Sequence, residues 1–121
     1  MSVTDIDRDR LESLTAGEAE IAVELLEALL EDAGPLVESA GASAERQAWG
    51  ELKETAHALK GISGNLGAAR LREAAEALES AARSDGSPAV AGIMDEVRSA
   101  LERVRAVHAA WAADPAAVFA A

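Results

Sequence analysis

A chain of 121 residues favours a single domain, and its formal net charge of −11 would repel the phosphates of nucleic acids. Cysteine is absent, which excludes disulfides, thiol chemistry and cysteine-ligated zinc, and no apolar run approaches the ~18–20 residues of a membrane helix, so we expect a cytoplasmic protein. With 30 alanines, 13 leucines and three aromatic residues, the composition favours helices over sheets and predicts an all-α fold.

The first half of the chain predicts a short helix followed by a long one. The short helix is expected at about 7–14. Thr15 and Glu18 have the spacing of a capping box, so the second helix should begin near Ala16. Its expected inward residues are Ile21, Leu25, Ala28 and Leu29.

Glycine and proline mark the expected breaks between helices. Pro35 removes one backbone donor and should kink or locally end the second helix, and residues 41–43 should form a loop. Residues 84–88 are the strongest turn signal in the chain, and Asp114-Pro115 should end the last helix.

Three further segments show helical periodicity, at about 47–65, 68–83 and 88–112. Pro88 fits the first turn of the last of these helices, where its missing N–H costs nothing. The inward residues expected in the segment 68–83 are Leu71, Ala74, Ala75, Leu78 and Ala82. Those expected in the segment 88–112 are Ile93, Val97, Leu101, Val104 and Trp111.

Four substantial helices with short links predict an antiparallel four-helix bundle, preceded by a short additional N-terminal helix. We expect one domain over residues 1–121, with the bundle at about 16–112. The tail at 113–121 is apolar but short, so we expect it to be loose or only lightly docked.

The helix expected at 47–65 carries the most informative pattern. Its inward stripe repeats at spacings of three and four residues, at Trp49, Leu52, Ala56, Leu59, Ser63 and Leu66. At 3.6 residues per turn, His57 lies about 140° from the centre of this stripe and should face solvent. Lys53, Lys60, Gly61 and Gly64 lie three, four or seven residues from His57 and share its surface.

This exposed surface has two interpretations. A neutral surface imidazole is a nucleophile near neutral pH, and neighbouring lysines would favour a dianionic group on it. Glycine costs a helix roughly 0.5–1 kcal/mol relative to alanine, so two bare positions beside a histidine would need a reason such as partner access. The alternative is an incidental surface histidine, with glycines that serve a helix crossing. Spacing alone does not separate the two.

The run His57-Ala-Leu-Lys-Gly-Ile-Ser-Gly-Asn-Leu-Gly-Ala68 resembles the motif of histidine-containing phosphotransfer (HPt) domains, the four-helix modules of two-component phosphorelays. Trp49, the leucine-rich run at 25–33 and Arg70-Leu71 are also similar to the family. The resemblance covers roughly residues 18–111, which is most of the chain.

The resemblance assigns roles residue by residue. It implies that His57 is the phosphoacceptor, that Lys60 contacts the phosphoryl group and that Gly61 leaves room for access. Ser63 and Gly67 match small positions near the end of that helix. The departures from the family pattern are Gln47-Ala48 in place of an acidic or Asn cap, Gly50 after Trp49, and Ile62 at a position that is commonly small. None of these departures alters His57, so they bear on stability or on partner choice.

The resemblance also implies a function. HPt domains carry a phosphoryl group between a histidine and a receiver aspartate, so the chain would be a phosphotransfer intermediate without catalytic turnover of its own. His57, through Nε2, would accept the group from a receiver or a kinase and pass it to another receiver. Partners would be receiver domains of response regulators or hybrid kinases, or a histidine kinase. We expect a monomer that docks them near Lys53 and Gly64. Mg²⁺ is expected on the receiver and no metal or cofactor on this chain.

Other candidate sites are weaker. His108 falls on the inward stripe of the last helix. This position favours a packed histidine over a second phosphorylation site or a metal site. Glu24, Glu27 and Glu31 could suggest a di-metal carboxylate bundle, but the Glu54–His57 pair that would complete it faces outward. Two other functions stay open: a helical adaptor that docks a receiver or kinase without transfer, and an unrelated acidic bundle.

Overall fold

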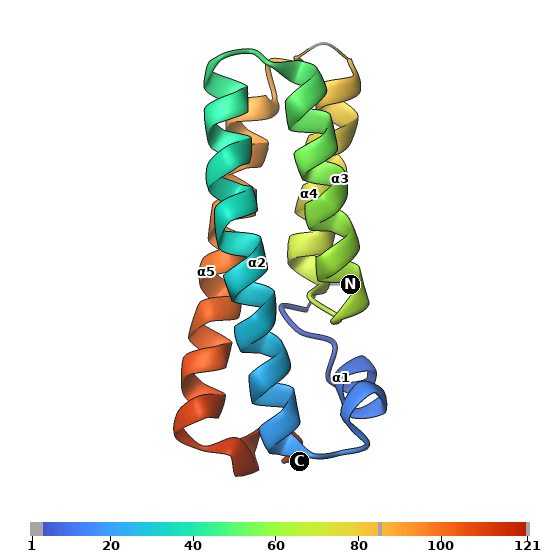
Figure 1. Ribbon diagram of the computed structural model, residues 1–121, viewed down its shortest axis with the longest axis vertical. Helices are drawn as coiled ribbons and strands as arrows, with labels where there is room; N and C mark the ends of the chain where they lie inside the picture. Colours follow the sequence, from blue (N-terminus) through green and yellow to red (C-terminus); the bar gives the residue numbers. More distant parts are fainter. Residues whose placement is uncertain (1–3, 85, 121) are drawn as a thin grey trace.

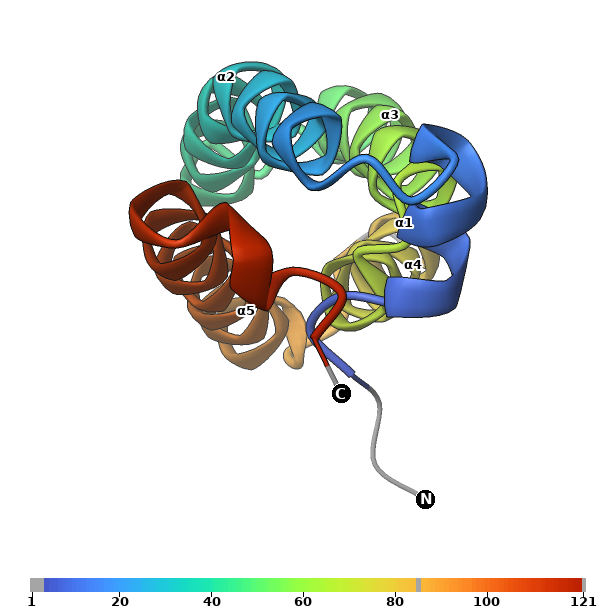
Figure 2. The ribbon, with the colours of Figure 1, turned by 90° about the horizontal axis from the view of Figure 1, so that it is seen from below.

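The computed structural model describes residues 4–84 and 86–120, and these ranges contain helices and no strand. The elements are α1 (Arg8–Thr15), α2 (Ala19–Glu45), α3 (Trp49–Asn65), α4 (Ala69–Arg83), α5 (Val90–Ala113) and the short 3₁₀ helix η1 (Pro115–Ala117). Helices α2 to α5 alternate in direction along one axis (Figure 1). Seen from the end they form a ring in which each packs against two others, with α1 beside one end (Figure 2). The predicted antiparallel four-helix bundle with an additional N-terminal helix is confirmed.

The core of the ring is aliphatic and rich in alanine. Each of the four long helices contributes fully or almost fully buried large side chains, including Leu26, Leu29, Leu52, Leu59, Leu71, Leu78, Val97 and Val104. Fully buried alanines lie between them and let the helices approach closely, among them Ala22, Ala33, Ala40, Ala56 and Ala75. Burial of one leucine or valine side chain stabilises a fold by about 1.5–3 kcal/mol, so this core supplies the main driving force for folding.

The predicted inward stripes of the last three helices agree well with the structure. In α3 the central members of the stripe are buried, and Trp49 and Leu66 at its two ends are half-buried. All five residues predicted for α4 are buried. In α5 the prediction holds for Val97, Leu101 and Val104, while Ile93 and Trp111 are half-buried against the core.

The predicted inward face of α2 is only partly right. Leu29 is buried as predicted and Leu25 is half-buried against the core, whereas Ile21 is 39% exposed and Ala28 is exposed. The other large buried residues, Leu26 and Val37, lie outside the predicted set. Apolar residues occupy more than one side of this helix, so its periodicity fits two phases. Packing against α3 and α5 selects one of these phases. The sequence of α2 alone does not contain the information for that choice.

The loop predicted at residues 41–43 is also wrong, because α2 continues through Pro35 to Glu45. Gly41 and Ser43 are buried, and the guanidinium of Arg98 from α5 lies over Gly41. Packing of this segment outweighs the roughly 1 kcal/mol that a glycine costs a helix.

The predicted capping box does not form. Thr15 belongs to α1, where its hydroxyl donates to the carbonyl oxygen of Leu11 at 2.9 Å, and the Glu18 side chain makes no capping bond to α2. Ala16 and Gly17 have positive φ, so these residues end a helix instead of starting one. Pro88 precedes α5 by two residues and is not in its first turn.

The C-terminal tail is docked, so of the two expectations, a loose or a lightly docked tail, the structure excludes the loose one. Val118 is fully buried and Phe119 packs half-buried against the core. Arg8 donates from Nε to the carbonyl of Val118 at 2.8 Å, and from Nη2 to those of Ala117 and Ala120 at 3.3 and 2.7 Å. One buried side chain and one guanidinium thus hold the segment; Ala121 lies outside the described residues.

The turn between α4 and α5 depends on Gly86. This residue has φ +88°, and a Cβ there would overlap the indole ring of Trp49. Gly86→Ala should therefore lower the free energy of unfolding by more than about 2 kcal/mol, because it adds both backbone strain and a steric clash. Urea unfolding measures this. The control is Gly92→Ala in α5, where a Cβ meets nothing within 4 Å; equal stability of the two variants would contradict the prediction.

Candidate functional site

His57 lies in the middle of α3, on the side that faces solvent and the neighbouring helix α4. Its side chain is 68% exposed, as the angular position in the helix predicts. The ring is nevertheless held, because Nδ1 lies 2.7 Å from Oε2 of Glu79 on α4. An exposed imidazole with one nitrogen anchored has a fixed orientation and still presents its ring to solvent.

Glu79 is the centre of a cluster of charged side chains between α3 and α4. It is only 3% exposed. Lys60 donates to Oε1 at 3.0 Å, and Arg83 donates to Oε2 at 3.2 Å, the oxygen that also contacts His57. A buried carboxylate is stable only when paired, and here two cations and an imidazole pair it. We call His57, Lys60, Glu79 and Arg83 the Glu79 cluster.

The partners of Glu79 keep it ionised. The hydrogen bond from Lys60 is the largest cause that lowers the pKa of Glu79 below the ordinary value of 4.5, and it outweighs burial, which acts in the opposite direction. The hydrogen bond with His57 and the charges of Lys60 and Arg83 lower this pKa further. An ionised carboxylate only accepts hydrogen bonds, so we assign the proton of a neutral His57 to Nδ1 and the lone pair to Nε2.

The other predicted site residues surround His57 with different accessibility. Gly61, one turn after His57, is exposed, and a Cβ there would meet nothing within 4 Å. Lys53, one turn before His57, is exposed as well. Gly64 is not bare, because the aliphatic part of the Arg72 side chain lies 3.1 Å from the position of its Cβ. The open surface beside His57 is therefore at Gly61, and Gly64 is partly covered.

Comparison with known proteins shows to which family the chain belongs. The model of the Hpt domain matches residues 24–107, which is well over half of the chain. The chain belongs to the Hpt domain family. Its resemblance to HPt domains, drawn above from the residues around His57, is confirmed.

Solved structures of HPt proteins have the same fold. The crystal structure of histidine-containing phosphotransfer protein B (HptB) from Pseudomonas aeruginosa PAO1 is 25% identical with a TM-score of 0.80, over 88% of this chain and 93% of that one. The HPT domain of an Hpt sensor hybrid histidine kinase from Shewanella is 20% identical with a TM-score of 0.66, over 88% and 95%. No curated protein matches the chain. Family membership supports a role as a phosphocarrier in a phosphorelay.

Sequence reasoning missed Glu79 of this HPt domain, although a signal for it was present. Glu79 lies four residues after the inward Ala75 and three before the inward Ala82, so it shares their stripe. A carboxylate inside an apolar stripe must have a partner. To predict that Glu79 pairs with His57 and Lys60 of α3, one must also know which helices are neighbours in the bundle. The apolar stripe of α4 does not give that information.

The weaker candidates do not form a second site in the described residues. His108 is half-buried on α5, and its Nε2 is buried without a hydrogen-bond partner. Glu24, Glu27 and Glu31 are exposed on α2. Among residues 4–84 and 86–120, no three metal-ligating side chains come together, and no helix there is long and apolar enough to span a membrane.

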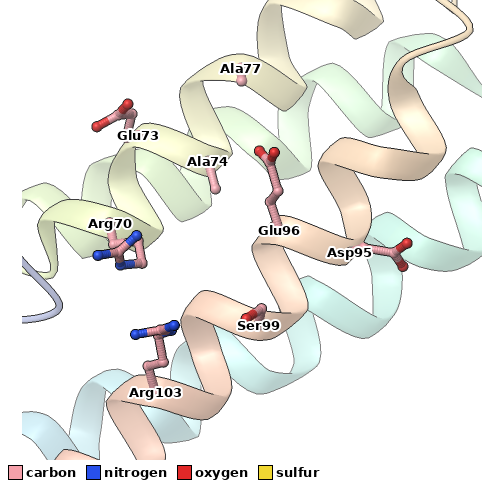
Figure 3. A pocket seen from close by; sticks show the side chains of 8 residues that line it. All are labelled: Arg70, Glu73, Ala74, Ala77, Asp95, Glu96, Ser99 and Arg103. Atoms are coloured by element: carbon pink, nitrogen blue, oxygen red, sulfur yellow. The ribbon is translucent and has the colours of Figure 1, made fainter. Parts of the chain in front are cut away.

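A groove between α4 and α5 is separate from the Glu79 cluster of this HPt domain. It has a volume of about 570 Å³ and is lined by residues of α4 and α5 alone: Arg70, Glu73, Ala74, Ala77, Asp95, Glu96, Ser99 and Arg103 (Figure 3). Arg70 and Arg103 both reach Asp5, at 2.9 and 3.8 Å, so the N-terminal segment is bound at this end of the groove. The groove contains no member of the Glu79 cluster.

The lowered pKa of Glu79 predicts a specific acid sensitivity. Its contribution to folding stability is present above the ordinary glutamate pKa of 4.5 and is lost as the pH falls through its lower value in the folded state. Urea unfolding over this acid range should therefore show a steeper loss of stability in the parent than in Glu79→Gln. Glu76→Gln, at an exposed position of α4, is the control and should keep the parent slope. Parallel curves for the parent and Glu79→Gln would contradict the prediction.

Proposed function

We propose that this HPt domain accepts a phosphoryl group on Nε2 of His57 from a receiver aspartate or a kinase, and passes it to another receiver aspartate. One observation carries the proposal: the exposed imidazole of His57 is bound through Nδ1 to the buried, ionised carboxylate of Glu79. This arrangement favours the tautomer in which Nε2 holds the lone pair, and it limits rotation of the ring. Both effects favour in-line attack on phosphorus.

The proposed transfer balances without any other reactant. The Nε2 lone pair attacks the phosphorus of an aspartyl phosphate on a docked receiver. A nitrogen–phosphorus bond forms while the bond from phosphorus to the aspartate oxygen breaks, which returns the receiver carboxylate. The ring keeps its Nδ1 proton and becomes positively charged, and the Glu79 carboxylate stabilises that charge. Transfer to the next aspartate reverses these steps and restores the neutral ring.

The surroundings of His57 support close approach of a partner. Gly61 leaves the surface open one turn after the histidine. Lys53 is exposed one turn before it and would attract both an acidic receiver site and the phosphoryl group. Gly64 would contribute to docking only at the edge, together with the side chain of Arg72 that covers it. Lys60 supplies positive charge through the Glu79 cluster.

The remaining parts of the proposal concern setting and partners. The partners would be receiver domains of response regulators or hybrid kinases, or a histidine kinase, each bound by a monomer in the cytoplasm. When bound on the receiver, Mg²⁺ would neutralise charge on the transferring group, and we propose no cofactor on this chain. We also propose no catalytic turnover of its own, since the chain would be both acceptor and donor of the same group.

The test is transfer from a receiver domain charged with a small phosphodonor such as acetyl phosphate. The expected result is one added phosphoryl group per chain, mapped by mass spectrometry to the peptide that contains His57. The protein with phosphodonor but no receiver is the control for direct chemical labelling. Receivers that bind the protein without transfer would instead indicate an adaptor, and neither binding nor transfer across the receivers of the source organism would indicate an unrelated acidic bundle.

A further inference from the structure

Acidic and basic side chains are distributed unevenly around the bundle. Helix α2 contains seven acidic residues and neither lysine nor arginine, whereas α3, α4 and α5 each contain equal numbers of acidic and basic residues. The acidic excess of the four long helices is therefore concentrated on α2. Because α2 and α4 pack on opposite flanks of α3 (Figure 2), a partner that docks over His57 meets a strongly acidic helix on one side and a balanced one on the other.

Acidic residues of α3 and α2 lie together on the flank where these two helices meet. The hydroxyl of Ser43 on α2 donates to Glu51 of α3 at 3.4 Å, which identifies the facing sides of the two helices. Glu54 lies one turn after Glu51, on the same side of α3. Asp32 lies three turns before Ser43, on the same side of α2. Both Glu54 and Asp32 are exposed, so this flank presents carboxylates to solvent.

The opposite flank of α3, toward α4, presents basic residues. Lys60 reaches across to α4 within the Glu79 cluster, and exposed Lys53 lies two turns before it on the same side of α3. Arg72 of α4 lies over Gly64 of α3. Its ion pair with the next turn of α4 spans 3.6 Å between two exposed side chains, which makes it weak. The guanidinium can therefore turn toward a partner.

His57 lies at the boundary between the two kinds of charge. Glu54 and Lys53 precede it by three and four residues, and at 3.6 residues per turn these positions fall on its two sides. An aspartyl phosphate is anionic, so the acidic site of a receiver is attracted to the basic side and repelled by the acidic one. A surface with both signs of charge fits a partner that also has both, in the complementary arrangement.

Resting on the proposed function, we propose that this charge boundary sets the orientation of the docked receiver. The acidic site that contains the receiver aspartate lies toward Lys53 and Arg72, and a basic part of the receiver surface lies along Glu54 and Asp32. The HPt domain thus selects receivers whose acidic site is bordered on one side by lysine or arginine, and rejects receivers that are acidic on both sides.

The test compares two charge reversals that change the net charge by two units in opposite directions. Lys53→Glu makes the α4 side acidic, and Asp32→Lys makes the α2 side basic. Both residues are exposed, so both variants should fold, which urea unfolding checks. Each should weaken the affinity for an unphosphorylated receiver that binds the parent by at least about threefold, measured by isothermal titration at low ionic strength. High salt should reduce the difference from the parent.

Glu96→Lys is the matched control, because it makes the same charge change as Asp32→Lys at an exposed position of α5, diagonally across the ring from α3 (Figure 2). It should bind the receiver within about twofold of the parent. Tighter binding by both Asp32→Lys and Glu96→Lys would show that only net charge matters and would overturn the proposal. Parent-like affinity of Lys53→Glu or Asp32→Lys, or equal weakening by Glu96→Lys, would overturn it as well.

Failure of the proposed function gives a different result. A receiver that binds the parent but leaves His57 without a label would contradict transfer, while the affinities of the charge variants would still decide the orientation. Absence of binding by every receiver of the source organism would overturn both proposals.

Discussion

Replacing His57 with glutamine should abolish phosphoryl acceptance while the free energy of unfolding changes by less than about 1 kcal/mol. The side chain is 68% exposed, so its loss removes little packing. Glutamine keeps a donor that can reach Glu79, which limits the cost of leaving the buried carboxylate short of a partner. The amide has no nucleophilic ring nitrogen, so no phosphoramidate can form. Transfer from a charged receiver, followed by intact-mass measurement, gives the first quantity and urea unfolding gives the second.

His108→Gln is the matched control for that experiment. It removes the second of the two histidines in the chain, on α5, and should retain labelling at the parent rate. Labelling that persists in His57→Gln and disappears in His108→Gln would move the phosphoacceptor to α5. A large loss of stability in His57→Gln would mean that the imidazole is a structural support of the α3–α4 interface and not only a reactive group.

Replacing Gly61 with leucine should block phosphoryl transfer nearly completely in a protein that stays folded. Side chains in a helix lean toward its N-terminus, so a leucine at this position would extend toward the imidazole of His57 one turn earlier. A Cβ at Gly61 meets nothing within 4 Å, so the added bulk occupies only the space that a receiver would need. Gly61→Ala should impair transfer less and raise the free energy of unfolding by roughly 0.5–1 kcal/mol, as expected when alanine replaces glycine in a helix.

Transfer rates and thermal unfolding of these variants test the prediction. Gly92→Leu is the control, since it adds the same side chain at an open position of α5; it should transfer at the parent rate. Parent-like transfer by Gly61→Leu would show that the open surface has no role in access. Strong destabilisation by Gly61→Ala would instead show that the glycine allows a helix contact.

The buried face of a helix could be predicted correctly where its apolar residues fit only one rotation about the helix axis, and less well where they fit several. In α3 and α4 the apolar residues form a single stripe, so the buried faces and the exposed position of His57 could be predicted from spacing alone. In α2 apolar residues lie on several sides, and the choice between Leu25 and Leu26 as an inward position depends on neighbouring helices. Two local signals were misleading. Thr15 bonds within α1, which ends at the positive-φ residues Ala16 and Gly17, and at Gly41 packing against Arg98 of α5 outweighs the helix-breaking tendency of glycine.

The site shows the same division between local and long-range information. Residues on one helix, such as Lys53 and Gly61, could be related to His57 by counting. Glu79 follows His57 by 22 residues and meets it only because α3 and α4 pack side by side. That pairing also changes the interpretation of Lys60, which the helix surface alone presents as a free cation beside the histidine and which the structure shows bound to Glu79.

The docking of residues 117–120 on Arg8 has a practical consequence for protein engineering. The backbone N–H of Asp7 donates to the carbonyl of Gly67 at 2.7 Å, and Arg8 holds the carbonyls of Ala117, Val118 and Ala120. A fluorophore, affinity tag or fused module placed after this segment would therefore follow a part of the chain that is held at the end of the bundle where α2 begins and α5 ends (Figure 1).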